Sequence, residues 1–117
     1  MVYQAMLDKL CRRVPGSQGA LLLDEGGEVV VETSPRGEHL RLIGAYQGIA
    51  LAAARKTAEQ YDVGPVEHLV CRYAGGSVIV VPLKDGYFLV LAVGAETNVP
   101  LALFQSQQAQ EDLNREI

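Results

Sequence analysis

The sequence has no tryptophan, and its 117 residues include only two cysteines and two histidines. Cys11 and Cys71 are far apart and form no Cys-X-X-Cys pair, so we expect two buried free thiols in preference to a disulfide. His39 and His68 have no metal-ligand spacing, and His68 and Cys71 would point to opposite faces of a strand. The sequence therefore predicts no metal site.

Positive charge is also scarce, because ten Lys and Arg stand against fourteen Asp and Glu, for a net charge of −4. This balance argues against a nucleic-acid groove or a surface for anionic membranes, since both need a basic patch. No apolar run approaches the roughly 20 residues of a membrane span. The N-terminal residues do not follow the pattern of a signal peptide. We expect one soluble, cytoplasmic domain over residues 1–117.

Motifs for catalysis and nucleotide binding are missing as well. No serine lies in a nucleophile elbow, and the glycines form neither a dinucleotide-binding fingerprint nor a phosphate-binding loop. The carboxylates near the turns have the pattern of ordinary solvated groups, and nothing favours a glycosidase-like acid pair. The sequence therefore predicts no enzyme activity and no cofactor.

Hydrophobic periodicity predicts helices and strands in the order helix, two strands, helix, three strands, helix. Ser34 is a candidate N-cap for the long second helix, with Pro35 at its first position. The short connections between strands require antiparallel neighbours. We expect an α+β domain, a five-stranded antiparallel sheet with helices on both faces. The expected elements are a helix over 3–14, strands over 20–23 and 29–31, a helix over 38–60, strands over 66–73, 77–83 and 87–93, and a helix from about 98.

The helix expected over 38–60 is apolar around more than half of its circumference. One stripe is enough to cover a sheet, and it contains Leu40, Ile43, Gln47, Ala50, Leu51, Ala54 and Ala58. A second stripe contains Leu42, Tyr46, Ile49 and Ala53. The other helices have narrower stripes, so we interpret the second stripe as packing against another subunit. The alternative is that loops or another helix of the same chain cover it.

The strand expected over 66–73 supports the intermolecular interpretation. Alternation places Leu69, Cys71 and Tyr73 on one face, and Val66, His68, Val70 and Arg72 on the other. Its charged residues suit a strand at a sheet edge, where a two-fold dimer can pair the strand with its symmetry mate. The expected dimer interface consists of Leu42, Tyr46, Ile49, Ala53, Leu69, Cys71 and Tyr73.

The ordered pattern resembles the Roadblock/dynein light-chain domain family, in its bacterial-type, single-domain form. The resemblance covers about residues 6–113 and depends on the order of structural motifs. These are Val14-Pro15-Gly16, then 19–24, Gly26-Gly27-Glu28-Val29-Val30, the Ala-rich helix, and the closing strands at 76–81 and 87–93. The chain differs from many members before the last helix, where Thr97-Asn98-Val99-Pro100 replaces a Leu-Gly turn.

The resemblance implies a non-enzymatic homodimer, joined through the long helix and the following strand into one continuous sheet. Such dimers are platforms or regulators for small Ras-like GTPases, so the expected partner is a GTPase of this class. The expected partner surface is the polar arc of the long helix, with Arg41, Gly48, Ala52 and Arg55. The alternative function is ligand sensing by a PAS- or GAF-like module, which needs an internal pocket with polar groups among apolar walls.

Overall fold

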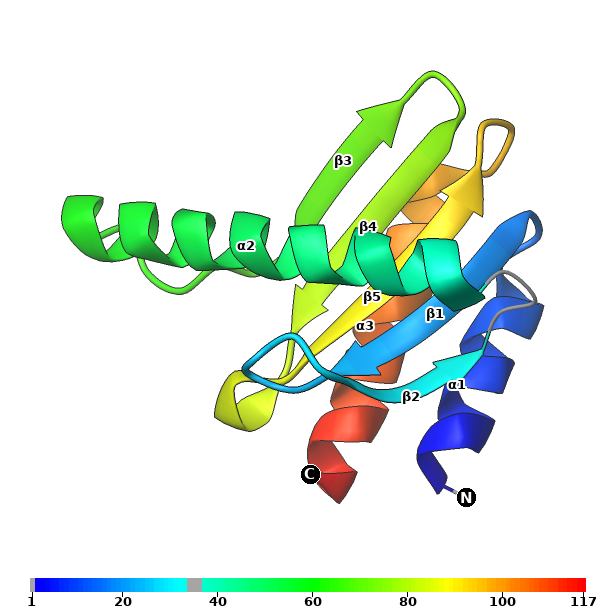
Figure 1. Cartoon of the computed structure of the whole chain (residues 1–117), viewed down its shortest axis with the longest axis horizontal. Coiled ribbons are helices and arrows are strands. Elements are labelled where there is room, and N and C mark those ends of the chain that lie inside the picture. Colours follow the sequence, from blue (N-terminus) through cyan, green and yellow to red (C-terminus); the bar gives the residue numbers. More distant parts are fainter. Residues whose placement is uncertain (1, 34–36) are drawn as a thin grey trace.

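The computed structural model describes residues 2–33 and 37–117, and its elements follow the predicted order (Figure 1). Side chains are described for all of these residues except 37–39. The candidate cap Ser34 lies outside the described residues. The elements are α1 (Val2–Arg13), β1 (Ser17–Leu23), β2 (Val29–Thr33), α2 (Gly37–Tyr61), β3 (Leu69–Tyr73), β4 (Gly76–Pro82), the short 3-10 turn η1 (Lys84–Gly86), β5 (Phe88–Gly94) and α3 (Val99–Glu116).

The strands form one five-stranded sheet in the order β2-β1-β5-β4-β3, and every neighbouring pair is antiparallel. Short turns connect β1 to β2 and β3 to β4. At the first turn the Asp24 carboxylate accepts hydrogen bonds from the backbone N–H groups of Gly26 and Glu28, at 2.9 and 3.0 Å. This sheet confirms the predicted fold class, and it places β3 at an edge, as its charged residues indicated.

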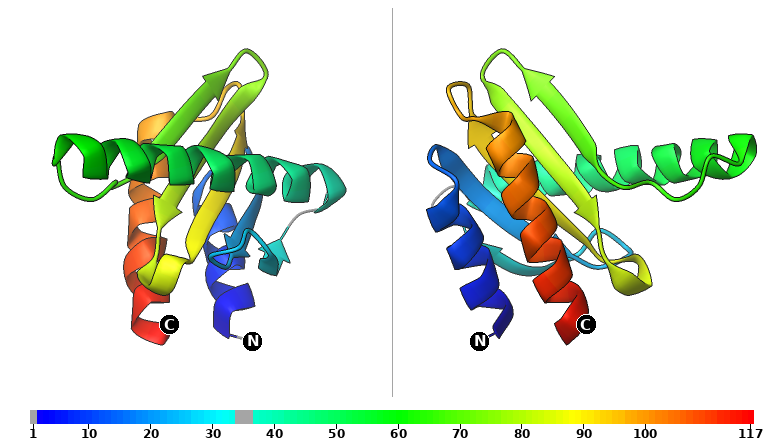
Figure 2. Two further views of the ribbon diagram at one scale, coloured as in Figure 1. Left: turned by 60° about the vertical axis from the view of Figure 1, so that its left-hand side comes forward. Right: turned by 180° about the vertical axis from the view of Figure 1, so that it is seen from behind.

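Helices cover both faces of the sheet, with α1 and α3 on one side and α2 on the other (Figures 1 and 2). Strands β1, β4 and β5 alternate between two hydrophobic clusters, so their side chains are buried on both faces. The N-cap Asn98 begins α3, because its side-chain oxygen accepts a hydrogen bond from the Leu101 N–H at 3.0 Å. The inner face of α3 consists of its buried residues, Ala102, Ser106, Ala109 and Leu113.

The prediction that β3 begins at residue 66 is wrong, because the strand begins at Leu69. Val66 packs on the α2 side of the sheet and not beside Val70, whose side chain lies on the α1 and α3 side. Leu69 pairs with Val80, and the same register would place residue 67 opposite Pro82. Proline has no N–H to donate, so the ladder cannot continue in that direction.

Helix α2 crosses the sheet and extends beyond its β3 edge (Figures 1 and 2). Leu51 is the last described residue of this helix whose side chain is buried, and the following turns are half-buried or exposed as far as Tyr61. The part of the helix after Leu51 therefore overhangs the sheet. In the described part of the chain, no helix is both long and apolar enough to cross a membrane.

Candidate interaction surface on the long helix

The second apolar stripe of α2 is uncovered in the single chain. Leu42, Tyr46 and Ile49 are 56%, 63% and 67% exposed, whereas Leu40 and Leu51 of the first stripe are buried. Ala53 is also exposed. The structure therefore confirms that the first stripe faces the sheet and that no described residue of this chain covers the second.

The exposed side chains of α2 differ in direction. At about 100° per residue, Leu42 and Ile49 lie within roughly 20° of the point opposite Leu40 and Leu51, which face the sheet. Leu42 and Ile49 therefore point straight away from the sheet. Tyr46 lies farther round the helix, on the side where α2 borders the part of the sheet that it leaves uncovered.

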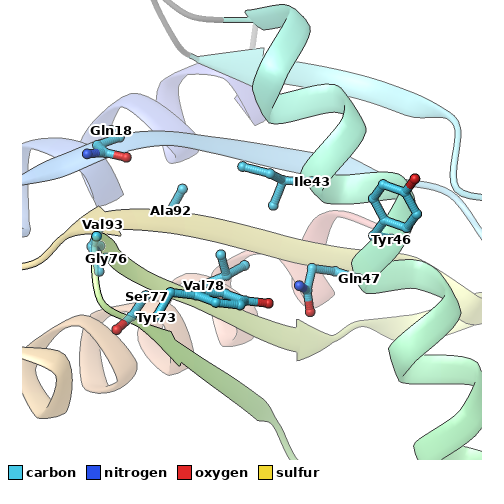
Figure 3. Close-up of a pocket in the computed structure, with 11 residues that line it drawn as sticks. Gln18, Ile43, Tyr46, Gln47, Tyr73, Gly76, Ser77, Val78, Ala92 and Val93 are labelled. Carbon is cyan, nitrogen blue, oxygen red and sulfur yellow. The ribbon is translucent and has the colours of Figure 1, made fainter.

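A cavity of about 390 Å³ opens on that side, between α2 and the part of the sheet that carries the β3–β4 turn (Figure 3). Ile43, Tyr46 and Gln47 form its wall on α2, and Val78 and Ala92 belong to its floor. The remaining lining residues are Gln18, Tyr73, Gly75, Gly76, Ser77 and Val93. The cavity is mostly apolar with a few amide and hydroxyl groups, which is the composition of many binding sites.

Gln47 and Cys71 are brought together beside this cavity. Gln47 is only 5% exposed although it is polar, and the Cys71 thiol donates a weak hydrogen bond to its Oε1 with an S···O distance of 3.8 Å. Leu69, Cys71 and Tyr73 face the α2 side of the sheet, which confirms the predicted alternation within β3. Sequence reasoning missed the contact with Gln47, although a lone glutamine in an apolar stripe was a signal for it.

The charged residues of the predicted partner surface have partners or neighbours within the chain. Arg41 forms an ion pair with Glu32 of β2, and its Nε lies 3.1 and 3.2 Å from the two carboxylate oxygens. The hydrogen bond from Arg41 holds the pKa of Glu32 below its ordinary value. Arg55 is half-buried beside a hollow between α2 and the chain that follows it, where Asp62 and Val66 are neighbours.

The structure corrects the expectation for Gly48, which does not leave room for a partner. It faces the chain's own sheet, because a Cβ added at Gly48 would lie 3.1 Å from Cζ of Phe88. Ala52 is exposed, as expected. Arg41, Gly48, Ala52 and Arg55 therefore do not form one continuous surface.

The described residues contain no group of three or more His, Cys, Asp or Glu side chains able to hold a metal ion. Cys11 and Cys71 are free, as predicted, but both are half-buried and not fully buried. Burial raises the pKa of the Cys11 thiol, which lowers its reactivity. Nδ1 of His68 is buried and has no hydrogen-bond partner. The dominant feature of this surface is thus apolar area, not reactive chemistry.

Comparisons with known proteins agree on the fold. The family model described as Roadblock/LC7 domain matches residues 3–92. MJ1340 of Methanocaldococcus jannaschii is 24% identical over 111 residues, covering 92% of this chain and 96% of that protein. The Roadblock/LC7 domain from Streptomyces avermitilis has a TM-score of 0.88 at 18% identity, covering 97% of this chain and 95% of that one. MglB of Myxococcus xanthus has a TM-score of 0.87 at 15% identity, covering 98% and 94%.

Proposed function

The chain belongs to the Roadblock/LC7 domain family, and from that premise we propose that it is a non-enzymatic homodimeric adaptor that binds and regulates a small Ras-like GTPase. The observation that carries the proposal is the apolar stripe of α2, with Leu42, Tyr46 and Ile49 exposed. Contiguous apolar area of this kind marks an interaction site in a protein of this size.

The dimer joins two copies along β3, about an axis perpendicular to the sheet. Three features support this arrangement: β3 is an edge strand, α2 overhangs that edge, and a mostly apolar cavity lies beside α2. Rotation about such an axis places the overhanging part of each α2 above the uncovered part of the other sheet. Each overhang then fills the other copy's cavity, next to Tyr46. The residues of the expected interface that this arrangement retains are Tyr46, Ala53, Leu69, Cys71 and Tyr73.

Leu42 and Ile49 have a different role in this arrangement. A copy that continues the sheet has its own α2 beside the first, at the same height above the sheet. Side chains that point straight away from the sheet stay uncovered between such copies. We therefore transfer Leu42 and Ile49 from the expected dimer interface to the GTPase-binding surface, next to Ala52. Two copies present these residues together and form one apolar platform on the layer of α2 helices.

The test measures binding of the Ras-like GTPases of the same cell, loaded with GDP or a non-hydrolysable GTP analogue, by surface plasmon resonance. Ile49→Asp is expected to weaken binding about 10-fold or more, because a central apolar contact is lost and a charge must be desolvated. Phe104→Asp is the matched control, since Phe104 is exposed on the opposite helix layer. Equal affinities for Ile49→Asp and wild type would reject this surface, and no binding of any such GTPase would reject the partner class.

Ligand sensing is the second candidate, and one observation favours it. The cavity beside α2 contains the buried amide of Gln47 among apolar walls. A thermal-shift screen with small metabolites tests this function. A compound that raises the unfolding temperature of the wild type but not of Gln47→Leu would support sensing. If no compound does so, the result supports the interpretation that α2 of the second copy fills the cavity.

A further inference from the structure

We infer that Cys71 faces the partner subunit's Cys71 across the two-fold axis of the dimer, so that a peroxide can join the two subunits through a disulfide. This inference rests on the proposed dimer and specifies its strand register.

Only Val70 and Arg72 direct their backbone hydrogen-bonding groups outward from β3. The strand is joined to β4 by Ala74 and Gly75 alone, so Tyr73 and Gly76 close the hairpin as a hydrogen-bonded pair. Hydrogen-bonded pairs alternate with non-hydrogen-bonded ones along an antiparallel ladder. The backbone groups of Leu69, Cys71 and Tyr73 therefore form hydrogen bonds with β4. The free edge of the strand presents the backbone N–H and C=O groups of Val70 and Arg72.

A two-fold axis at residue 71 uses all of these outward groups. Val70 then pairs with the partner's Arg72, and Arg72 pairs with the partner's Val70, so the outward groups on both strands are satisfied. An axis at residue 72 would place Arg72 against the partner's Arg72, and like charges directly opposite each other are destabilising. An axis at residue 70 would place Arg72 against residue 68, which lies outside the strand.

The side chains on the α2 face favour the same register. An axis at residue 71 places Leu69 opposite the partner's Tyr73, and the reverse pair forms on the other side of the axis. Tyr73 is 61% exposed in the single chain, so this contact covers an aromatic ring that otherwise faces water. Aromatic residues paired with aliphatic ones across strands stabilise a sheet. Cys71 lies between these two pairs and faces its own copy.

Directly opposite residues in a non-hydrogen-bonded pair have Cα atoms about 4.5 Å apart. A disulfide requires Cα atoms about 4.4–6.8 Å apart, so the two thiols meet the geometric condition. The thiol of Cys71 donates a weak 3.8 Å hydrogen bond to Gln47, which forming a disulfide at the axis would replace. Cys11 belongs to the hydrophobic cluster on the opposite face of the sheet and has no such counterpart.

Hydrogen peroxide supplies the oxidant. One Cys71 thiolate attacks a peroxide oxygen, the O–O bond breaks, and the products are a sulfenic acid and hydroxide, which takes up the released proton as water. The partner's Cys71 thiolate then attacks the sulfenic sulfur, forming the S–S bond and displacing the second oxygen as water. Overall two thiols lose two electrons and two protons to one peroxide, which gives one disulfide and two waters.

The experiment uses the Cys11→Ser variant, in which Cys71 is the only cysteine. Light scattering first measures the mass of this variant in solution. Peroxide is then added, and the products are separated on a non-reducing gel. Most of the chain is expected to shift to a covalent dimer, which dithiothreitol reverses. In a Cys11→Ser, Cys71→Ser background, Val70→Cys and Arg72→Cys place single thiols next to the axis and are expected to give little covalent dimer.

The outcomes separate this inference from the proposed dimer. A dimer by light scattering whose Cys71 does not cross-link would overturn the inference while the dimer stands. Cross-linking of Val70→Cys or Arg72→Cys in place of Cys71 would do the same and would reveal the true axis. A chain that remains monomeric at every concentration would overturn both. Circular dichroism of each variant checks that it is folded.

Discussion

Gly48 of α2 packs against the Cζ end of the Phe88 ring in β5, because a Cβ added to Gly48 would lie 3.1 Å from Cζ. This close approach seats α2 on the sheet. Gly48→Val is expected to lower the free energy of unfolding by about 2 kcal/mol, since overpacking forces the ring or the helix to move. Urea unfolding measures this change in the free energy of unfolding. Ala52→Val, one turn later and exposed, is the control, and an equal loss in both variants would contradict this packing.

The free edge of β3 gives a prediction about proline. Arg72→Pro removes an outward N–H that has no partner in the chain's own sheet, so the monomer is expected to stay folded. The dimer is expected to weaken at least 10-fold, because that N–H pairs with the second copy. Sedimentation at several concentrations measures the affinity, and Arg72→Ala is the control. A proline variant that dimerises as tightly as the alanine variant would show that β3 is not the joining strand.

The overhanging part of α2 gives a prediction about charge. Ala53→Glu places a carboxylate in the proposed helix contact, where an unpaired charge costs several kcal/mol, about 3–5 by analogy with broken buried pairs. Light scattering is expected to show monomers at concentrations where the wild type is dimeric. Ala52→Glu introduces the same charge at the neighbouring exposed position and is expected to dimerise normally. Identical behaviour of the two variants would argue against a contact centred on Ala53.

The ion pair between Arg41 and Glu32 gives a prediction about pH. Because the pKa of Glu32 is lowered in the folded chain, the pair contributes stability above the ordinary carboxyl pKa. That contribution is lost as the pH falls through the lowered pKa. Arg41→Gln is expected to raise the Glu32 pKa towards its ordinary value, which an NMR titration of the side-chain carboxyl carbon measures. Arg115→Gln, whose partner is Asp112, should leave Glu32 unchanged. An unaltered Glu32 pKa in Arg41→Gln would contradict this coupling.

Periodicity was sufficient to predict the order of the elements and most of their inner faces. Leu40 and Leu51 are buried and Leu42 and Ile49 exposed, because the side-chain direction on a helix follows from position alone. The start of β3 was mispredicted because it depends on Pro82, a residue of another strand. The hydrophobic pattern within one segment does not show whether the neighbouring strand has the N–H groups needed to continue the pairing.

The candidate site was only partly predictable for the same reason. Gly48 belongs to the polar arc by its position on the helix, and only the crossing of α2 over β5 shows that it faces Phe88. The meeting of Gln47 with Cys71, and the cavity beside them, also depend on where α2 crosses the sheet. Contacts between distant segments follow from tertiary geometry, which the helical pattern does not contain.

The mass of the protein in solution shows whether two copies associate, as joining along β3 requires. Sedimentation equilibrium is run from low to high micromolar chain concentration, under reducing conditions so that no disulfide contributes. A dimer has a mass of twice the 12.6 kDa of the chain, and we expect this mass at the upper concentrations, with dissociation on dilution. A constant mass of 12.6 kDa over the whole range would contradict it.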